Sequence, residues 1–174
     1  MPSQMLRLSP EAIASALANE ADQAGSTALM TYNFAGPQHA PLWRWRNLRI
    51  IMGISPEDER SMRSVQRIQG LASINHTARV RLLLRSHVKL SLFWRGSRVR
   101  AMLSSMNGVA PSNFREIGIL ITGDRAAALA HYFEQSWTIS TPVNPLDLKD
   151  VVRTLGSSVF EVAGTDPKPS KSET

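Results

Sequence analysis

Residues 87–107, HVKLSLFWRGSRVRAMLSSMN, are the stretch that decides the fold prediction. Two apolar segments flank Arg95-Gly96-Ser97, a combination typical of two strands joined by a tight turn. Polar side chains are placed at the two ends of this predicted hairpin. His87 and Lys89 stand two apart where the first strand begins, and Ser105 and Asn107 stand two apart where the second strand ends.

The spacing of these polar residues predicts that they meet. Residues two apart on a strand point to the same face of a sheet, so His87 and Lys89 are expected to share one side. The hairpin would bring Ser105 and Asn107 to the same spot. The next predicted strand, Phe114–Thr122, carries Glu116 among apolar neighbours, and a carboxylate in such surroundings requires a partner.

These five residues are the parts of a metal-free phosphoryl-transfer site. An imidazole can attack phosphorus and form a covalent intermediate. An ammonium and an amide can hold the phosphate oxygens while charge builds up in the transition state. A carboxylate can fix the tautomer of the imidazole. The sequence therefore predicts a catalytic group made of His87, Lys89, Ser105, Asn107 and Glu116.

Each of the five also has an ordinary structural interpretation. A histidine in a strand is commonly a hydrogen-bonded structural residue, and Lys89 alone would be an edge-strand charge that discourages aggregation. Ser105 and Asn107 alone would be turn formers, and Glu116 could be a surface salt-bridge partner. Only the ordered combination indicates catalysis.

Strand patterns recur along the rest of the chain, in alternation with helix patterns. Strands are predicted at Thr27–Phe34, Leu48–Ile54, Val80–Leu84, Val88–Trp94, a segment ending near Ser105, and Phe114–Thr122.

The predicted helices lie between these strands. Ser9 is expected to cap the first helix, with Pro10 at its first position. The alternation predicts an α/β fold with a mixed, largely parallel sheet and helices on both faces. Helices are predicted at Ala12–Gln23, about Ala40–Trp45, from Ser55 towards Ile74, from Asp124 as N-cap to about Trp137, and at Leu146–Leu155.

Length and composition indicate one domain of ordinary size. The chain has 174 residues, of which 43% are hydrophobic, and no cysteine, so disulfides and thiolate chemistry are excluded. Residues 1–163 are expected to form the domain, and residues 164–174, which lack apolar content, a disordered tail. The sequence has no apolar run long enough for a membrane span and no signal-peptide pattern in its first residues, which favours a cytoplasmic location.

The charge of the chain points to a polyanionic partner. The formal net charge is +6 and the sequence pI is about 10.5, which favours nucleic acid or an anionic membrane surface. Arginines flank the polar motif on both sides and could neutralise backbone phosphates. In the alternative interpretation they form the solvated face of strands. The predicted substrate-binding residues are Arg85, Arg95, Arg98 and Arg100.

The order of these motifs resembles the phospholipase D superfamily. Its H-x-K signature is matched by His87-Val88-Lys89, and its G-S-x-N element is matched in part by residues 104–107, SSMN. An acidic residue, here Glu116, then precedes a helix ending in aromatic residues, here Phe133 and Trp137. The resemblance extends over residues 48–137 and implies a phosphodiesterase with a histidine nucleophile and no cofactor or metal.

Two departures from the family pattern bear on activity. The usual motif has aspartate five residues after the lysine, where this chain has Trp94, and Ser104 replaces the glycine of the second element. In this respect the chain is similar to a nuclease branch that includes metal-independent restriction endonucleases. There a glutamate on the later strand orients the histidine, and Glu116 occupies that place. The resemblance implies a DNA nuclease that acts through a phosphohistidine, with DNA a more probable substrate than RNA.

Two alternatives remain open at this point. Trp94 and Ser104 favour a catalytically inactive subunit that binds nucleic acid or takes part in assembly. A lipid phosphodiesterase or transferase is disfavoured because the sequence shows no membrane-facing amphipathic segment, and no membrane partner is expected. The family's active site uses two H-x-K copies and this chain carries one. The resemblance therefore implies a homodimer, although a related partner subunit would also supply the second copy.

Overall fold

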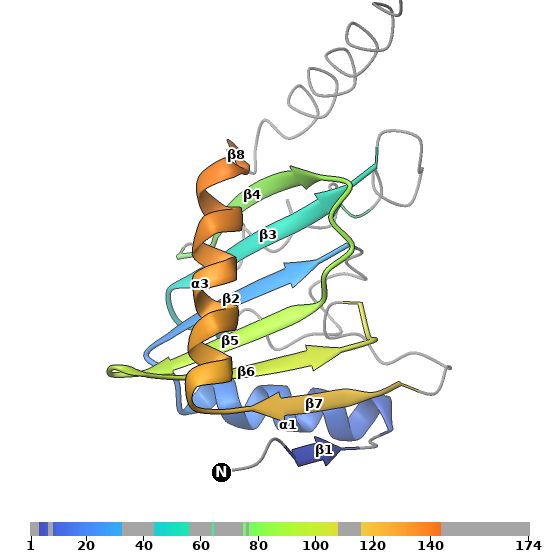
Figure 1. The fold of residues 1–174 in the computed structure, drawn as a ribbon, viewed down its shortest axis with the longest axis vertical. Helices are drawn as coiled ribbons and strands as arrows, with labels where there is room; N and C mark the ends of the chain where they lie inside the picture. Colours follow the sequence, from blue (N-terminus) through green and yellow to red (C-terminus); the bar gives the residue numbers. More distant parts are fainter. Residues whose placement is uncertain are drawn as a thin grey trace, which may run out of the picture.

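A computed structural model shows a mixed α/β fold built on one sheet (Figure 1). The sheet has eight described strands in the order β1-β7-β6-β5-β2-β3-β4-β8. The structure describes residues 4–6, 9–32, 44–55, 64, 75, 77–107 and 116–143. The strands are β1 (Gln4–Leu6), β2 (Ser26–Thr31), β3 (Leu48–Ile54), β4 (Arg79–Leu84), β5 (Leu90–Arg95), β6 (Arg98–Ser104), β7 (Gly118–Ile121) and β8 (Thr141–Val143).

The mixed character of the sheet is confirmed, but the expectation of a largely parallel sheet is wrong. Among the described strands, only the pairs β2–β3 and β3–β4 are parallel. The other neighbouring pairs of described strands are antiparallel. The reason lies in the turn at Gly96, whose φ of 60° folds β5 back onto β6. Strands joined by so short a turn can pair only antiparallel.

The predicted hairpin is confirmed, with shorter strands than expected. β5 pairs with β6 from Leu90 opposite Leu103 to Arg95 opposite Arg98. His87 and Lys89 therefore lie in the extended connection before β5, and Glu116 lies before β7. The strands were predicted too long at these two places because apolar residues, Val88 and Ile117, continue beyond the residues that pair in the sheet.

Two helices are described, α1 (Pro10–Asp22) and α3 (Asp124–Ile139). Ser9 caps α1 as predicted, and its Oγ accepts a hydrogen bond from the backbone N–H of Ala12 at 3.3 Å. The N-cap of α3 is Gly123 and not Asp124, which is the first helical residue. The positive φ of Gly123, 68°, explains the difference, because glycine adopts that conformation readily.

The strand residues divide between two hydrophobic clusters. In β2, Leu29 joins one cluster and Met30 the other, as expected for side chains that alternate across a sheet. Ile13 and Leu17 of α1 join the cluster of Leu29. Phe133 of α3 joins the cluster of Met30. Figure 1 shows α3 lying across one face of the sheet, from β7 towards β8.

Several predicted elements fall outside the described residues. They are most of the segment 40–45, the helix predicted from Ser55 to Ile74, the helix at Leu146–Leu155, and the tail with its boundary at residue 163. None of the helices that the structure does describe is long and apolar enough to cross a membrane.

Candidate active site

His87 and Lys89 contact each other directly. The Nζ of Lys89 lies 2.9 Å from Nδ1 of His87, and it also donates to the backbone carbonyl of His87 at 3.2 Å. The two side chains therefore share one side of the chain, as the spacing predicted, although neither is in a strand. A charged ammonium can only donate, so in this arrangement Nδ1 accepts and the proton of the neutral ring is on Nε2.

The segment that carries His87 is held by a close backbone approach. A Cβ at Gly53, near the end of β3, would stand 1.8 Å from the carbonyl oxygen of Ser86. Only glycine permits this approach. Arg85 adopts a φ of 56°, and its N–H donates to the carbonyl of Ile54 at 2.8 Å. Arg85 is two residues before His87 in the chain, so its exposed side chain lies at the same end of the sheet as His87.

Ser105 and Glu116 form a second contact at this end of the sheet. The hydroxyl of Ser105 donates to Glu116 Oε2 and accepts from the backbone N–H of Ile117 at 3.0 Å. The backbone of Ser105 also donates to the carbonyl of Ile117 at 2.9 Å. The bend after β6 is thereby tied to the segment before β7. The backbone N–H of Ser104 donates to the carbonyl of Lys89 at 3.3 Å, which places the bend beside the His87 segment.

The second departure from the family motif is accommodated within this bend. The hydroxyl of Ser104 donates to the carbonyl of Met106 at 3.2 Å. Asn107 follows on the same bend and is half-buried, and its Oδ1 has no hydrogen-bond partner among the described residues. Among the five predicted residues, direct side-chain contacts thus join His87 to Lys89 and Ser105 to Glu116.

Tyr32 is a site residue that the sequence did not reveal. It follows the last residue of β2, and its ring centroid lies 4.6 Å from that of His87 at an interplanar angle of 40°. Its position at the end of a buried strand beside the H-x-K segment was the available signal. The ring packing restricts the orientation of the imidazole.

Burial and Glu116 act in opposite directions on the pKa of Lys89. Burial, the larger cause, lowers the pKa of the Lys89 ammonium below its ordinary value of 10.5, and the negative charge of Glu116 raises it. Glu116 is therefore close enough for its negative charge to change the pKa of Lys89. In the unfolded chain Lys89 keeps its proton up to a higher pH than in the folded protein. Between the pKa of Lys89 in the folded protein and its pKa in the unfolded chain, the free energy of unfolding should therefore rise with pH.

The lowered pKa predicts an early alkaline loss of activity. If the Lys89 ammonium holds substrate phosphate, turnover of a chromogenic phosphodiester should fall with an apparent pKa below 10.5. In Lys89→Arg the rate, whatever its absolute value, should not fall in this alkaline range, because the guanidinium stays charged. A pH–rate profile from 7 to 11 tests the prediction. The same alkaline limb in both proteins would assign the titration to another group.

Three of the predicted substrate-binding arginines lie away from this site. Arg95 and Arg98 face each other at the turn end of the hairpin, and Arg100 is two residues further along β6. Six residues of extended chain separate Arg95 from Lys89, roughly 20 Å. Only Arg85 remains beside His87.

Trp94 also lies at the turn end and not beside His87. It pairs with Val99 and Ser26 in the sheet. The guanidinium of Arg49 stands 5.2 Å from its ring and 5.0 Å from the ring of Phe133 on α3. Trp94 therefore helps to pack α3 on the sheet. A carboxylate at this position would be five residues along the strand from Lys89, too far to contact His87.

No group of three or more histidine, aspartate or glutamate side chains among the described residues is arranged to hold a metal ion. The polar groups that the described contacts place at this end of the sheet are the Lys89 ammonium, the Ser105 hydroxyl and the Glu116 carboxylate. Such a set suits an anionic substrate better than a bound cation.

Comparisons with known proteins concern the fold. No protein-family model and no curated protein matches the sequence. Solved structures do match. Nuc from Salmonella typhimurium, described as a phospholipase D family member, aligns with a TM-score of 0.58 at 15% identity, over 82% of this chain and 98% of Nuc. NucT from Helicobacter pylori aligns with a TM-score of 0.59 at 14% identity over the same shares.

The chain has the phospholipase D fold. Two further proteins with matching structures show how widely this fold is used. TrmBL2, described as an archaeal chromatin protein with a novel mode of DNA binding, aligns with a TM-score of 0.53 at 14% identity, over 82% of this chain and 55% of TrmBL2. A phosphatidylserine synthase from Haemophilus influenzae aligns with a TM-score of 0.53 at 16% identity, over 87% of this chain and 44% of the synthase. The phospholipase D fold therefore accounts for the strand order, and the choice of substrate depends on the site.

Proposed function

We propose that the protein is a metal-independent phosphodiesterase of the phospholipase D type, acting on DNA through a phosphohistidine intermediate. One observation carries the proposal: Lys89 Nζ lies 2.9 Å from the His87 ring, at the sheet end where Ser105 contacts Glu116. A nucleophile, a phosphate-binding cation and a carboxylate thus gather in one place on the phospholipase D fold.

The proposed reaction has two displacements at phosphorus. The His87 Nε2 lone pair attacks, a P–N bond forms, and the P–O bond to the leaving group breaks. The leaving oxygen takes a proton from the histidine of a second subunit. Water then gives a proton back to that histidine and attacks phosphorus, and the P–N bond breaks. Lys89, Asn107 and Arg85 stabilise the charge on the non-bridging oxygens in both steps.

For Nε2 to attack, the ring proton must be on Nδ1. In the structure Lys89 Nζ contacts Nδ1, so an orienting carboxylate has to take the place of that ammonium. We assign this role to Glu116, whose charge already acts on Lys89. Lys89 would then turn towards the substrate phosphate.

DNA is the proposed substrate because of the charge of the chain and the likeness to TrmBL2, a protein described as binding DNA. The net charge of +6 favours a polyanion. The direct test is to incubate labelled single-stranded and double-stranded DNA with the protein in excess chelator. Cleavage that survives the chelator is expected. Cleavage that disappears and returns with magnesium or zinc would contradict the proposal.

A catalytically inactive subunit that binds nucleic acid is the second candidate. The position of the ring proton favours it: Nδ1 accepts from Lys89, so the proton is on Nε2, and Nε2 has no free lone pair for attack until the ring changes its tautomer. A protein that binds DNA and cleaves neither DNA nor a small phosphodiester would have this function.

Homodimer formation is predicted from the single H-x-K copy in the chain. The acid–base histidine of the proposed reaction then comes from His87 of a second copy across a two-fold axis. Light scattering at assay concentrations should give the mass of a dimer. Full activity from a protein that is monomeric at those concentrations would refute the two-subunit site.

A further inference from the structure

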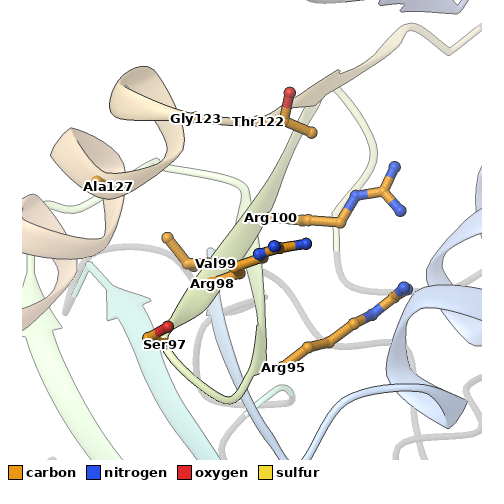
Figure 2. A pocket seen from close by; sticks show the side chains of 8 residues that line it. All are labelled: Arg95, Ser97, Arg98, Val99, Arg100, Thr122, Gly123 and Ala127. Carbon is orange, nitrogen blue, oxygen red and sulfur yellow. The ribbon is translucent and has the colours of Figure 1, made fainter. Parts of the chain in front are cut away.

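A hollow lies at the turn end of the β5–β6 hairpin, away from the candidate active site. Its volume is about 770 Å³. Figure 2 shows that the side chains of its three arginines extend to the same side. The segment at the start of α3 also contributes to the lining, and the arginine side chains point away from it (Figure 2). The lining residues are Arg95, Ser97, Arg98, Val99, Arg100, Thr122, Gly123 and Ala127. We call this hollow the hairpin pocket.

A buried carboxylate neutralises only part of its charge. Glu20 of α1, 8% exposed, binds Arg95 Nη2 at 2.7 Å and Arg100 Nη1 at 2.8 Å. Arg98 is exposed and forms no ion pair with any residue that the structure describes. One negative charge therefore faces three positive charges. The Nε–H groups of Arg95 and Arg100 also have no acceptor among the described residues.

The arrangement suits a phosphate group. Guanidinium groups bind phosphate oxygens through paired N–H donors. Glu20 holds two of the three guanidinium groups in place, so less side-chain entropy is lost when an anion binds. Thr122, which follows β7, adds a hydroxyl to the lining. Asp124, the nearest acidic residue along the chain from Thr122, does not line the pocket.

We propose that the hairpin pocket binds a backbone phosphate of nucleic acid, remote from the phosphate that His87 would attack. The two ends of the hairpin are roughly 20 Å apart, which corresponds to about six base pairs of duplex. A substrate must then extend at least that far to occupy both places. This inference rests on the proposed function, which names DNA as the substrate and the phosphate attacked by His87 as the site of cleavage.

Arg98→Ala tests the pocket without disturbing the Glu20 ion pairs. Binding to a 24-base-pair duplex is measured in a His87→Ala background by fluorescence anisotropy over a range of salt. The loss of one phosphate contact should weaken binding roughly five- to tenfold near 0.1 M salt and reduce the log–log salt slope by about 0.9. In the wild-type background, Arg98→Ala should leave turnover of a small chromogenic phosphodiester unchanged.

Arg125→Ala is the matched control. Arg125 is exposed on the first turn of α3, carries the same charge, and is not part of the pocket lining. Duplex affinity should stay within about twofold of the parent. An unchanged salt slope in Arg98→Ala, or an equal loss in Arg125→Ala, would overturn the inference, as would complete release of the duplex by 1 mM inorganic phosphate. A specific loss of binding in a protein that never cleaves DNA would support the pocket and reject the proposed nuclease function.

Discussion

His87→Ala is expected to reduce DNA cleavage and turnover of a chromogenic phosphodiester to the background of the assay. The reason is chemical, because His87 supplies the nitrogen of the proposed P–N bond and alanine has no group that can replace it. Removal of a nucleophile costs on the order of six orders of magnitude in rate in enzymes whose catalytic residues act as a unit. Initial rates at saturating substrate give the result.

His131→Ala is the matched control for this substitution. His131 is exposed on α3, so its loss should leave the rate unchanged. Circular dichroism and melting temperature should show that both variants fold. A His87→Ala protein that retains even a hundredth of the wild-type rate would exclude His87 as the nucleophile.

Glu116→Gln is expected to lower turnover by up to about four orders of magnitude, the cost of losing a carboxylate that fixes a catalytic tautomer. Glutamine has the size of glutamate and can still accept the hydrogen bond from Ser105, so the bend should stay in place. DNA affinity and melting temperature should change little. Single-turnover rates, which separate chemistry from binding and release, are the appropriate measurement.

Ser105→Ala separates the two roles that Glu116 can have. If Glu116 only holds the bend through Ser105, removing the hydroxyl should slow the reaction as much as Glu116→Gln does. If Glu116 orients His87, Ser105→Ala should cost far less. An unchanged rate in Glu116→Gln would show that neither role matters for turnover.

The sequence was sufficient to predict the central strands and the hairpin. β3 was predicted with its observed bounds, Leu48–Ile54, because apart from Arg49 its residues are apolar and buried, and polar residues stand on both sides of it. The turn at Gly96 was recognisable from its residue types. The same turn requires antiparallel pairing of β5 and β6, whereas alternation of helices and strands is typical of a parallel sheet.

For the candidate site, the sequence predicted which residues share one end of the sheet but not how each of them is placed. Two residues with the spacing of His87 and Lys89 share a side in any extended segment, so their contact did not depend on the strand bounds. The contact of Glu116 with Ser105 depends on where β7 begins, which local sequence determines poorly. The position of Tyr32 depends on strand order, which periodicity does not encode.

The arginines show the same limit on a larger scale. Arg95, Arg98 and Arg100 are close in sequence to the H-x-K motif, and nearness in sequence suggested nearness to the site. An extended strand instead carries them about 13 to 20 Å away, where Arg95 and Arg100 share Glu20. The partner of these arginines comes from α1, far away in the sequence, and could not be anticipated from local pattern.

The measurement that tests the central claim most directly is a search for the covalent intermediate. Protein is mixed with a ³²P-labelled phosphodiester in excess chelator, quenched in alkali within the first turnovers, and digested for mass spectrometry. Phosphohistidine is stable to alkali and labile to acid, and we predict label with these properties on the peptide containing His87 and none in His87→Ala. Substrate cleavage by the wild-type protein with no label on His87 at any quench time would contradict the proposed mechanism.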